Sequence, residues 1–401
     1  MAQHDACNPN APVDVDLEED RYSRLRLIPW WEQDRLAAAR VMVVGAGAIG
    51  NELCKNLALL GIGNVLVVDL DTIEDTNLTR SVLFTHEDAG QDKALVAAGS
   101  MRRLNPDVRV EAHRANIVHD IGAGVFADMD IVLGGLDNRE ARLFVNQVCW
   151  RLGKPWIDGA IEVVHGLARG FYPPDGPCYE CTLTDLDYKL LNMRRSCALL
   201  TRDDVLEGKV PTTPTTASVI AGIQVQEAVK WLHRDRDLPL LSGRGFVFNG
   251  LTHDSYVVQY RRRDDCPAHD EQGPVTSTDF SAATATLGEL LGFVRGRIGP
   301  EAVLEFDREI CTALHCPRCD VAQEVFVPLG KLTGRQAACP RCGQARSPQS
   351  VHAIHGDEQY LGLTLAQFGI PPYDIVRGRC GMHSEHYLLA GDRGQALGAI
   401  A

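Results

Sequence analysis

Apolar residues in the first part of the chain form short uninterrupted runs that alternate with longer stretches of helical periodicity. Such runs, bounded by glycine or charged residues, are typical of strands buried on both faces of a sheet. The clearest are Val41–Val44, Val65–Val68, Val108–Ala112 and Asp130–Leu133. Arg139–Leu152 and Thr216–Leu232 carry apolar residues at helical spacing. This alternation predicts an α/β fold with a doubly wound, mostly parallel sheet whose two faces are covered by helices.

The pattern also divides the chain of 401 residues. A polar stretch containing Pro267, Gly273 and Pro274 interrupts it and predicts a linker. Further on, the sequence predicts a short helix, a turn at Pro371-Pro372 and two strands. We therefore expect an acidic flexible tail (1–20), a core domain (21–265) with a charged loop at about 185–210, a linker (266–278) and a C-terminal zinc-ribbon domain (279–401).

A glycine-rich loop ends the first apolar run. Gly45, Gly47 and Gly50 form a Gly-x-Gly-x-x-Gly motif between that run and a helical stretch, the arrangement in which backbone N–H groups meet phosphate oxygens. Asp69 ends the next apolar run, nineteen residues after Gly50, where a carboxylate can bind a ribose hydroxyl. Taken alone, this is an ordinary dinucleotide site, and an NAD(P)-dependent oxidoreductase remains one alternative.

The polar residues that follow favour ATP over a nicotinamide cofactor. Asp71, Asn77, Arg80 and Lys93 come after Asp69 in close succession, and a triphosphate needs such groups to neutralise its charge as pyrophosphate leaves. A lone Arg or Lys would be read as a solvated surface charge, but the joint spacing from Asp69 argues for a site.

Asp137 ends a further apolar run. Because the carboxyl ends of parallel strands meet at one edge of a sheet, Gly45, Asp69 and Asp137 should lie together. The alternative for Asp137 is a helix N-cap, since Asn138-Arg139 begins a helical stretch.

With these motifs the chain resembles the ThiF/MoeB and ubiquitin-activating-enzyme superfamily, which adenylates the C-terminal glycine of ubiquitin-like proteins. The resemblance runs from Arg21-Tyr22-Ser23-Arg24 to about Leu232. It implies that Asp69 binds the ribose of ATP, and that Asp137 binds Mg²⁺. The triphosphate ligands that it implies are Asn77, Arg80 and Lys93. It also implies that Arg24 reaches the ATP of a neighbouring subunit, so we expect a homodimer. Ser81 departs from the family pattern, in which many members carry Gln.

The cysteine spacing points to metal rather than to disulfides. Two C-x-x-C motifs separated by nineteen residues match a structural four-thiolate zinc ribbon; their cysteines are Cys316, Cys319, Cys339 and Cys342. Four unrelated thiols or a redox pair are the alternative. In the family, a knuckle at the position of Cys178 and Cys181 pairs with a second one beyond the last helix, usually another C-x-x-C. Here Cys266 and His269 stand there, which predicts a Cys₃His zinc site rather than a lone knuckle without metal.

Cys197 is the candidate acceptor of an acyl group. It lies in the charged loop next to Arg194 and Arg195, which favour the reactive thiolate. Activating enzymes of the superfamily carry their acceptor cysteine in such a crossover loop. The alternatives are an incidental loop thiol or persulfide sulfur transfer, and Cys380 and Cys311 are the next candidates for acceptor.

Composition narrows the class of protein. With 53 acidic against 40 basic residues, the net charge of −13 disfavours nucleic-acid binding. No apolar run approaches the roughly 20 residues of a membrane-spanning helix. The polar start lacks the apolar region of a signal peptide. We therefore expect a cytoplasmic protein that binds neither nucleic acid nor membrane.

These features predict an enzyme that uses ATP, Mg²⁺ and Zn²⁺ to activate a ubiquitin-like protein through its C-terminal glycine. It would form an adenylate and then a thioester on Cys197, for transfer to a downstream carrier of the ubiquitin-conjugating type. The first alternative is a sulfur-carrier adenylyltransferase for molybdopterin or thiamine synthesis. We favour conjugation because the zinc-containing appendage could recruit such a carrier.

Overall fold

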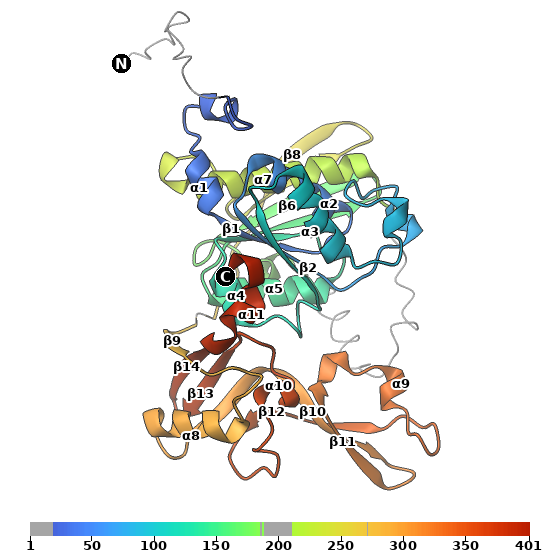
Figure 1. Ribbon diagram of the computed structural model, residues 1–401, viewed down its shortest axis with the longest axis vertical. Coiled ribbons are helices and arrows are strands. Elements are labelled where there is room, and N and C mark those ends of the chain that lie inside the picture. Colours follow the sequence, from blue (N-terminus) through green and yellow to red (C-terminus); the bar gives the residue numbers. More distant parts are fainter. Residues whose placement is uncertain (1–18, 185–186, 188–210, 271) are drawn as a thin grey trace, which may run out of the picture.

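The protein consists of two lobes, each built around its own sheet (Figure 1). The computed structural model describes residues 19–184, 187, 211–270 and 272–401. None of the helices in these ranges is long and apolar enough to cross a membrane.

The first lobe contains an eight-stranded sheet in the order β3-β2-β1-β4-β5-β6-β7-β8. Its strands are β1 (Arg40–Val44), β2 (Asn64–Asp69), β3 (Arg109–Arg114), β4 (Ile131–Gly134), β5 (Trp156–Glu162), β6 (His165–Phe171), β7 (Arg244–Asn249) and β8 (Asp254–Gln259). The first five strands pair in parallel, and β6 to β8 continue the sheet as an antiparallel meander. The predicted mostly parallel sheet is therefore confirmed.

Helices cover both faces of this sheet, as its alternating side chains require. Within β1, Val41 and Val43 pack into one core, whereas Met42 and Val44 pack into the other. The first core is covered by α1 (Gln33–Ala38), α2 (Ala48–Leu60), α3 (Lys93–Leu104) and α7 (Pro214–Leu232). The second is covered by α4 (Ala123–Ala127) and α5 (Arg139–Arg151). The sheet is doubly wound, as predicted.

The second lobe is built on a six-stranded sheet. Its strands are β9 (Val275–Thr278), β10 (Val303–Cys316), β11 (Val321–Pro328), β12 (Ser347–Ile354), β13 (Ile375–Cys380) and β14 (His383–Leu389). The helices α8 (Leu287–Ile298), α9 (Gly334–Ala337) and α10 (Leu365–Phe368) accompany it. The predicted short helix, proline turn and two strands correspond to α10, the turn at 371–372, β13 and β14.

The end of the described chain returns to the first lobe. The helix α11 (Arg393–Leu397) lies beside α4 (Figure 1). Leu397 and Ile400 are buried in the core that contains Met42 and Val44. His113 of β3 hydrogen-bonds the carbonyl of Ala396 at 2.8 Å. Residues 396–400 thus complete a core that the early strands begin.

A buried ion pair also joins the two lobes, at the start of α4. Arg308 of β10 donates to the Asp374 carboxylate at 2.9 Å, and Asp374 also accepts the backbone N–H of Ala123 at 2.8 Å. Arg308 donates to the carbonyl of His119 as well, at 3.0 Å. The domain boundaries expected from the sequence stay a prediction, because the two lobes share both this ion pair and a core.

Candidate nucleotide and metal sites

The glycine loop is closed tightly on one side and open on the other. Gly45 has φ +91°, and a Cβ there would lie 2.5 Å from the carbonyl oxygen of Gly135. A Cβ on Gly50 would lie 1.9 Å from the carbonyl oxygen of Gly45. At Gly47, the residue before α2, a Cβ would meet no atom within 4 Å. The loop therefore packs against the end of β4 and leaves free space at the N-terminus of α2, where a phosphate fits.

Asp69 lies at the end of β2, next to this loop. Its two carboxylate oxygens accept backbone N–H groups, one from Ala46 at 2.6 Å and one from Asp71 at 2.7 Å. Burial raises the pKa of Asp69, and the two N–H groups partly oppose that rise. Each carboxylate oxygen has a second lone pair, so the group can still accept a ribose hydroxyl.

The basic residues of the site lie on the segment that follows Asp69. Lys93 begins α3, is 12% exposed, and forms an ion pair with Asp71 at 3.1 Å. Arg80 donates to the carbonyl of Thr76 at 2.5 Å. Asn77 is buried in the same turn and accepts the backbone N–H of Glu74. The ion pair with Asp71 holds Lys93 close to the end of β2, whereas Arg80 is held by a carbonyl of its own turn.

Asp137 lies in the turn after β4 and does not cap the helix that follows. The N-cap of α5 is Asn138, whose side chain accepts the N–H of Ala141 at 2.8 Å. Asp137 is exposed, and a 3.3 Å contact from the Asn138 amide reaches its carboxylate. The alternative of Asp137 as the N-cap is therefore wrong, and its carboxylate is exposed.

Arg24 lies far from the nucleotide loop of its own chain. Its neighbour Tyr22 contacts Gly61, at the C-terminal end of α2, and accepts a hydrogen bond from Asn105. The glycine loop is at the opposite end of α2, and a helix of 13 residues is about 20 Å long. The exposed Arg24 therefore lies near the end of α2 that is remote from the glycine loop of its own chain.

Cys197 lies outside the described residues, but the residues on both sides of its loop are placed. Asp187 forms an ion pair with Arg139 at 3.0 Å, and Arg139 begins α5, two residues after Asp137. At the other end, the carbonyl of Pro211 accepts the N–H of Val163 at 2.7 Å. Among the other acceptor candidates, Cys311 is buried and burial raises its pKa, which disfavours the thiolate.

The first cysteine cluster, here called the knuckle cluster, comprises Cys178, Cys181, Cys266 and His269. The sulfur of Cys178 is 3.8 Å from that of Cys181 and 3.6 Å from that of Cys266, and the Cys181 sulfur is 3.3 Å from His269 Nε2. Thiolates at about 2.3 Å from a tetrahedral zinc ion are roughly 3.8 Å apart. The cluster fits Zn²⁺, and the ring of Trp150 stacks on His269 at 4.4 Å.

The second cluster, here called the ribbon cluster, comprises Cys316, Cys319, Cys339 and Cys342. Cys316 ends β10, and its sulfur is 3.7 Å from that of Cys342. The sulfurs of Cys319 and Cys339 are 4.0 Å apart. All four ligand atoms lie within 4.8 Å of one another, so this cluster also fits a tetrahedral ion.

The sequence matches the ThiF family over residues 20–268. This range contains the glycine loop, Asp69, Asp137 and the first three residues of the knuckle cluster. The chain belongs to the ThiF family. The predicted resemblance to the ThiF/MoeB and ubiquitin-activating superfamily is thereby confirmed.

The chain is also similar to individual proteins. The SAMP-activating enzyme E1 of Haloferax volcanii is 35% identical over 63% of this chain and 90% of its own length. The sulfur carrier protein adenylyltransferase of Thermus thermophilus is 40% identical over 41% of this chain and 64% of its own length. A crystal structure of E. coli MccB with ATP has a TM-score of 0.53 at 24% identity, covering 64% of this chain and 75% of that one, and is similar in fold.

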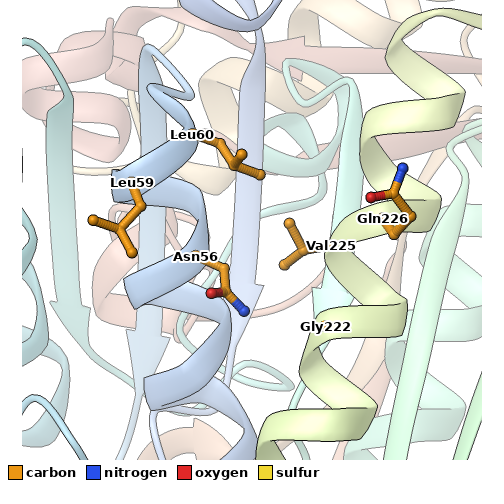
Figure 2. A pocket seen from close by; sticks show the side chains of 6 residues that line it. All are labelled: Asn56, Leu59, Leu60, Gly222, Val225 and Gln226. Atoms are coloured by element: carbon orange, nitrogen blue, oxygen red, sulfur yellow. The ribbon is translucent and has the colours of Figure 1, made fainter. Parts of the chain in front are cut away.

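A groove on the outside of this ThiF domain lies away from the nucleotide loop. Figure 2 shows it between α2 and α7, with Asn56, Leu59 and Leu60 on one side and Gly222, Val225 and Gln226 on the other. Its volume is about 320 Å³, and Leu59 is 52% exposed. The lining carries no ionisable side chain, so it has none of the groups that acid–base or phosphate chemistry needs.

Several polar residues of the ThiF domain support the site, although the sequence analysis did not single them out. Asn51 of α2 donates to the carbonyl of Ala46 at 2.6 Å and accepts the N–H of Leu83 at 2.8 Å. Gln224 of α7 donates to the carbonyl of Gly134 at 2.9 Å. A polar residue at a core-facing helical position is the signal that could have revealed both, because such a group must have a partner.

Proposed function

We propose that the protein uses MgATP to adenylate the C-terminal glycine of a ubiquitin-like protein. One observation carries the proposal: the open glycine loop, Asp69 and Lys93 share a sheet edge with Asp137, an exposed carboxylate that does not cap the following helix. The names of the relatives, an E1 enzyme and an adenylyltransferase, support it. A hydride-transfer enzyme would not need Asp137 or Lys93.

The reaction needs position and charge rather than a covalent enzyme intermediate. The partner's terminal carboxylate attacks the α-phosphate of ATP, the bond to the β-phosphate breaks, and pyrophosphate leaves. The N–H groups at the start of α2 bind the phosphates, and Lys93 and Arg80 offset the charge of the departing pyrophosphate. An exposed carboxylate suits Mg²⁺, which prefers oxygen ligands, so we assign the metal to Asp137. Mg²⁺ supplies further positive charge at the phosphates.

The second proposed step transfers the acyl group to Cys197. Its thiolate attacks the carbonyl of the adenylate, and AMP leaves as the thioester forms. Support comes from the loop's first described residue, Asp187, which is paired with Arg139 near Asp137. Support also comes from the basic neighbours of Cys197 in the sequence, which favour a thiolate. A carrier of the ubiquitin-conjugating type would then receive the acyl group.

A second candidate function is the adenylation of a sulfur-carrier protein, without a thioester on Cys197. The relatives that favour it are the Thermus enzyme and the adenylyltransferase and sulfurtransferase MOCS3 of mouse, which is 32% identical over 67% of this chain. Under either function, we assign structural zinc ions to the knuckle and ribbon clusters. Each cluster supplies four ligands and leaves no coordination position for a substrate.

We further propose a homodimer in which Arg24 acts on the ATP of the partner subunit. The distance between Arg24 and its own nucleotide loop supports this, and the α2–α7 groove (Figure 2) offers apolar surface for a second copy. Coexpression of Arg24→Ala and Asp137→Ala tests the idea. Random pairing gives half heterodimers with one intact site each, so about a quarter of wild-type activity should return. No recovery would contradict a role for Arg24 on the partner's ATP, and full activity of Arg24→Ala on its own would place Arg24 outside the site.

ATP–pyrophosphate exchange, with small proteins ending in Gly as substrates, tests the first step. Exchange dependent on such a protein and on Mg²⁺ supports adenylation, whereas hydride transfer without exchange supports the oxidoreductase. Cys197→Ala tests the second step. We expect this variant to keep exchange and to lose a thiol-sensitive covalent adduct whose mass matches a direct acyl link. Adenylation by wild type without any adduct would favour the sulfur-carrier function.

A further inference from the structure

A fully buried carboxylate lies directly behind the Asp137 turn, between two arginines. Asp158 of β5 has 0% of its side chain exposed, and Arg142 and Arg169 have 11% and 12% exposed. Arg142 comes from α5 and donates Nε to Asp158 at 2.8 Å. Arg169 stands opposite Asp158 in the β5–β6 ladder and donates both Nε and Nη2 to its second oxygen.

Stability alone does not explain such a cluster. Removing charges from water costs several kcal/mol per ion, and apolar residues of similar volume often serve stability as well or better. We therefore examine which groups the buried charges hold in place. Arg142 also donates through Nη2 to the carbonyl of Leu136 at 2.5 Å and to that of Gly159 at 3.1 Å. The Leu136 carbonyl belongs to the peptide unit that leads into Asp137.

On the side away from the Asp137 turn, Arg169 contacts the loop that carries Cys178 and Cys181 of the knuckle cluster. Arg169 Nη1 donates to the hydroxyl of Thr182, the residue after Cys181, at 3.2 Å. Its guanidinium also lies 4.8 Å from the ring centre of Tyr179, within the same knuckle. A continuous set of contacts thus runs from the knuckle loop through Arg169, Asp158 and Arg142 to the backbone before Asp137.

We propose that Asp158, clamped between Arg142 and Arg169, is a positioning residue that fixes the Asp137 turn for Mg²⁺. The proposal rests on the proposed adenylation and on the Mg²⁺ role of Asp137. Among the described residues, the Asp137 side chain has one hydrogen bond, the 3.3 Å contact from Asn138, so its location depends on the backbone. Mg²⁺ demands near-ideal octahedral geometry, and a ligand displaced by a fraction of an ångström binds it poorly. Outer partners of metal ligands typically matter by about 10- to 100-fold in affinity or activity.

Asp158→Asn tests the proposal because it removes the charge and keeps the shape. Calorimetric titration with ATP in EDTA and with ATP plus Mg²⁺ separates nucleotide binding from metal-dependent binding. We expect metal-free ATP affinity to stay near wild type and MgATP affinity to fall about tenfold. The Mg²⁺ concentration for half-maximal pyrophosphate exchange should rise by a similar factor. Arg169→Lys, which keeps the charge and loses the bidentate contact, should change both quantities in the same direction and by less.

Asp374→Asn is the matched control. Asp374 also sits in a buried pair with an arginine, 7% and 9% exposed, but contacts neither the Asp137 turn nor the knuckle. The two Asn variants should lower the temperature of thermal unfolding by similar amounts. Only Asp158→Asn should change the Mg²⁺ dependence of ATP binding and of exchange. If both keep wild-type Mg²⁺ dependence, Asp158 is merely structural and the proposal is wrong. If Asp158→Asn does not fold, Arg169→Lys decides by the same measurements. If the wild type shows no exchange, the proposed function is wrong. The two titrations would still measure whether Asp158 affects Mg²⁺-dependent binding of ATP.

Discussion

The knuckle and ribbon clusters offer nearly the same ligand geometry in very different surroundings. Both bring four ligand atoms within 4.8 Å, and both can saturate a tetrahedral ion. The knuckle loop contacts Arg169, whose hydrogen bonds continue toward the Asp137 turn. The ribbon instead packs within the second lobe, where Arg346 bonds Gln323 of β11 and the carbonyl of Gln336. Although the two clusters offer a metal the same ligand geometry, we expect loss of the metal to affect the nucleotide site only at the knuckle cluster.

Asp137→Ala should cause the largest loss of pyrophosphate exchange, and the losses caused by disrupting the two cysteine clusters are compared with it. We expect exchange to fall by about 100-fold or more, since the variant removes the carboxylate to which we assign Mg²⁺. The exposed position should leave folding and bound zinc unchanged. The measurements are initial exchange rates, zinc content by mass spectrometry and thermal unfolding. Near-normal exchange would remove the Mg²⁺ role from Asp137.

Disruption of each cluster tests the comparison directly. Cys178→Ser with Cys181→Ser should lower exchange about tenfold and destabilise the first lobe, because it loosens the loop that contacts Arg169. The matched pair Cys316→Ser with Cys319→Ser should lose one zinc ion as well and keep exchange within about twofold, since the four thiolates touch no nucleotide-site residue. Equal losses of exchange in the two variants would contradict the comparison.

Leu397→Ala tests whether the two lobes are coupled in stability through the core that they share. This side chain is fully buried in the core of the first sheet. A cavity there should cost about 2–5 kcal/mol of unfolding free energy. Because the core is shared, both lobes should melt at a lower temperature in a single transition. Met382→Ala is the control, since Met382 is fully exposed. Two separate transitions, with only the second lobe affected, would show that residues 396–400 are dispensable to the first.

The junction between the lobes should weaken in acid. Burial, reinforced by Arg308, lowers the pKa of His119 to about 4 from an ordinary value of 6.5. A histidine held neutral by the fold contributes stability that is full above 6.5 and is lost as the pH falls toward 4. The loss is at most roughly 3 kcal/mol, from 1.36 kcal/mol per pKa unit. Denaturant unfolding between pH 7.5 and 4 measures it, and His119→Gln should flatten the curve. An unchanged slope in that variant would assign the acid loss to other groups.

Features set by local spacing could be predicted from the sequence, and features set by distant pairing could not. The glycine loop, the strand ends at Asp69 and Asp137 and the ribbon cluster depend on patterns within short segments. The distant pairing in the knuckle cluster is predicted only through the family resemblance. Asp158 and Arg169 have no such pattern, because they meet only through the register of two antiparallel strands. The Ala-Leu-Gly-Ala-Ile segment at 396–400 is too short to reveal that it belongs to a core. The role of Cys197 stays a prediction.

The return of residues 396–400 to the first sheet also has a consequence for synthesis. Met42 and Val44 emerge early, and the side chains that complete their core are made more than 300 residues later. At about 5–20 residues per second, the nascent first lobe waits for tens of seconds with part of an apolar face uncovered. Transiently exposed apolar surface is prone to aggregate, so the first lobe is most vulnerable during translation rather than after it.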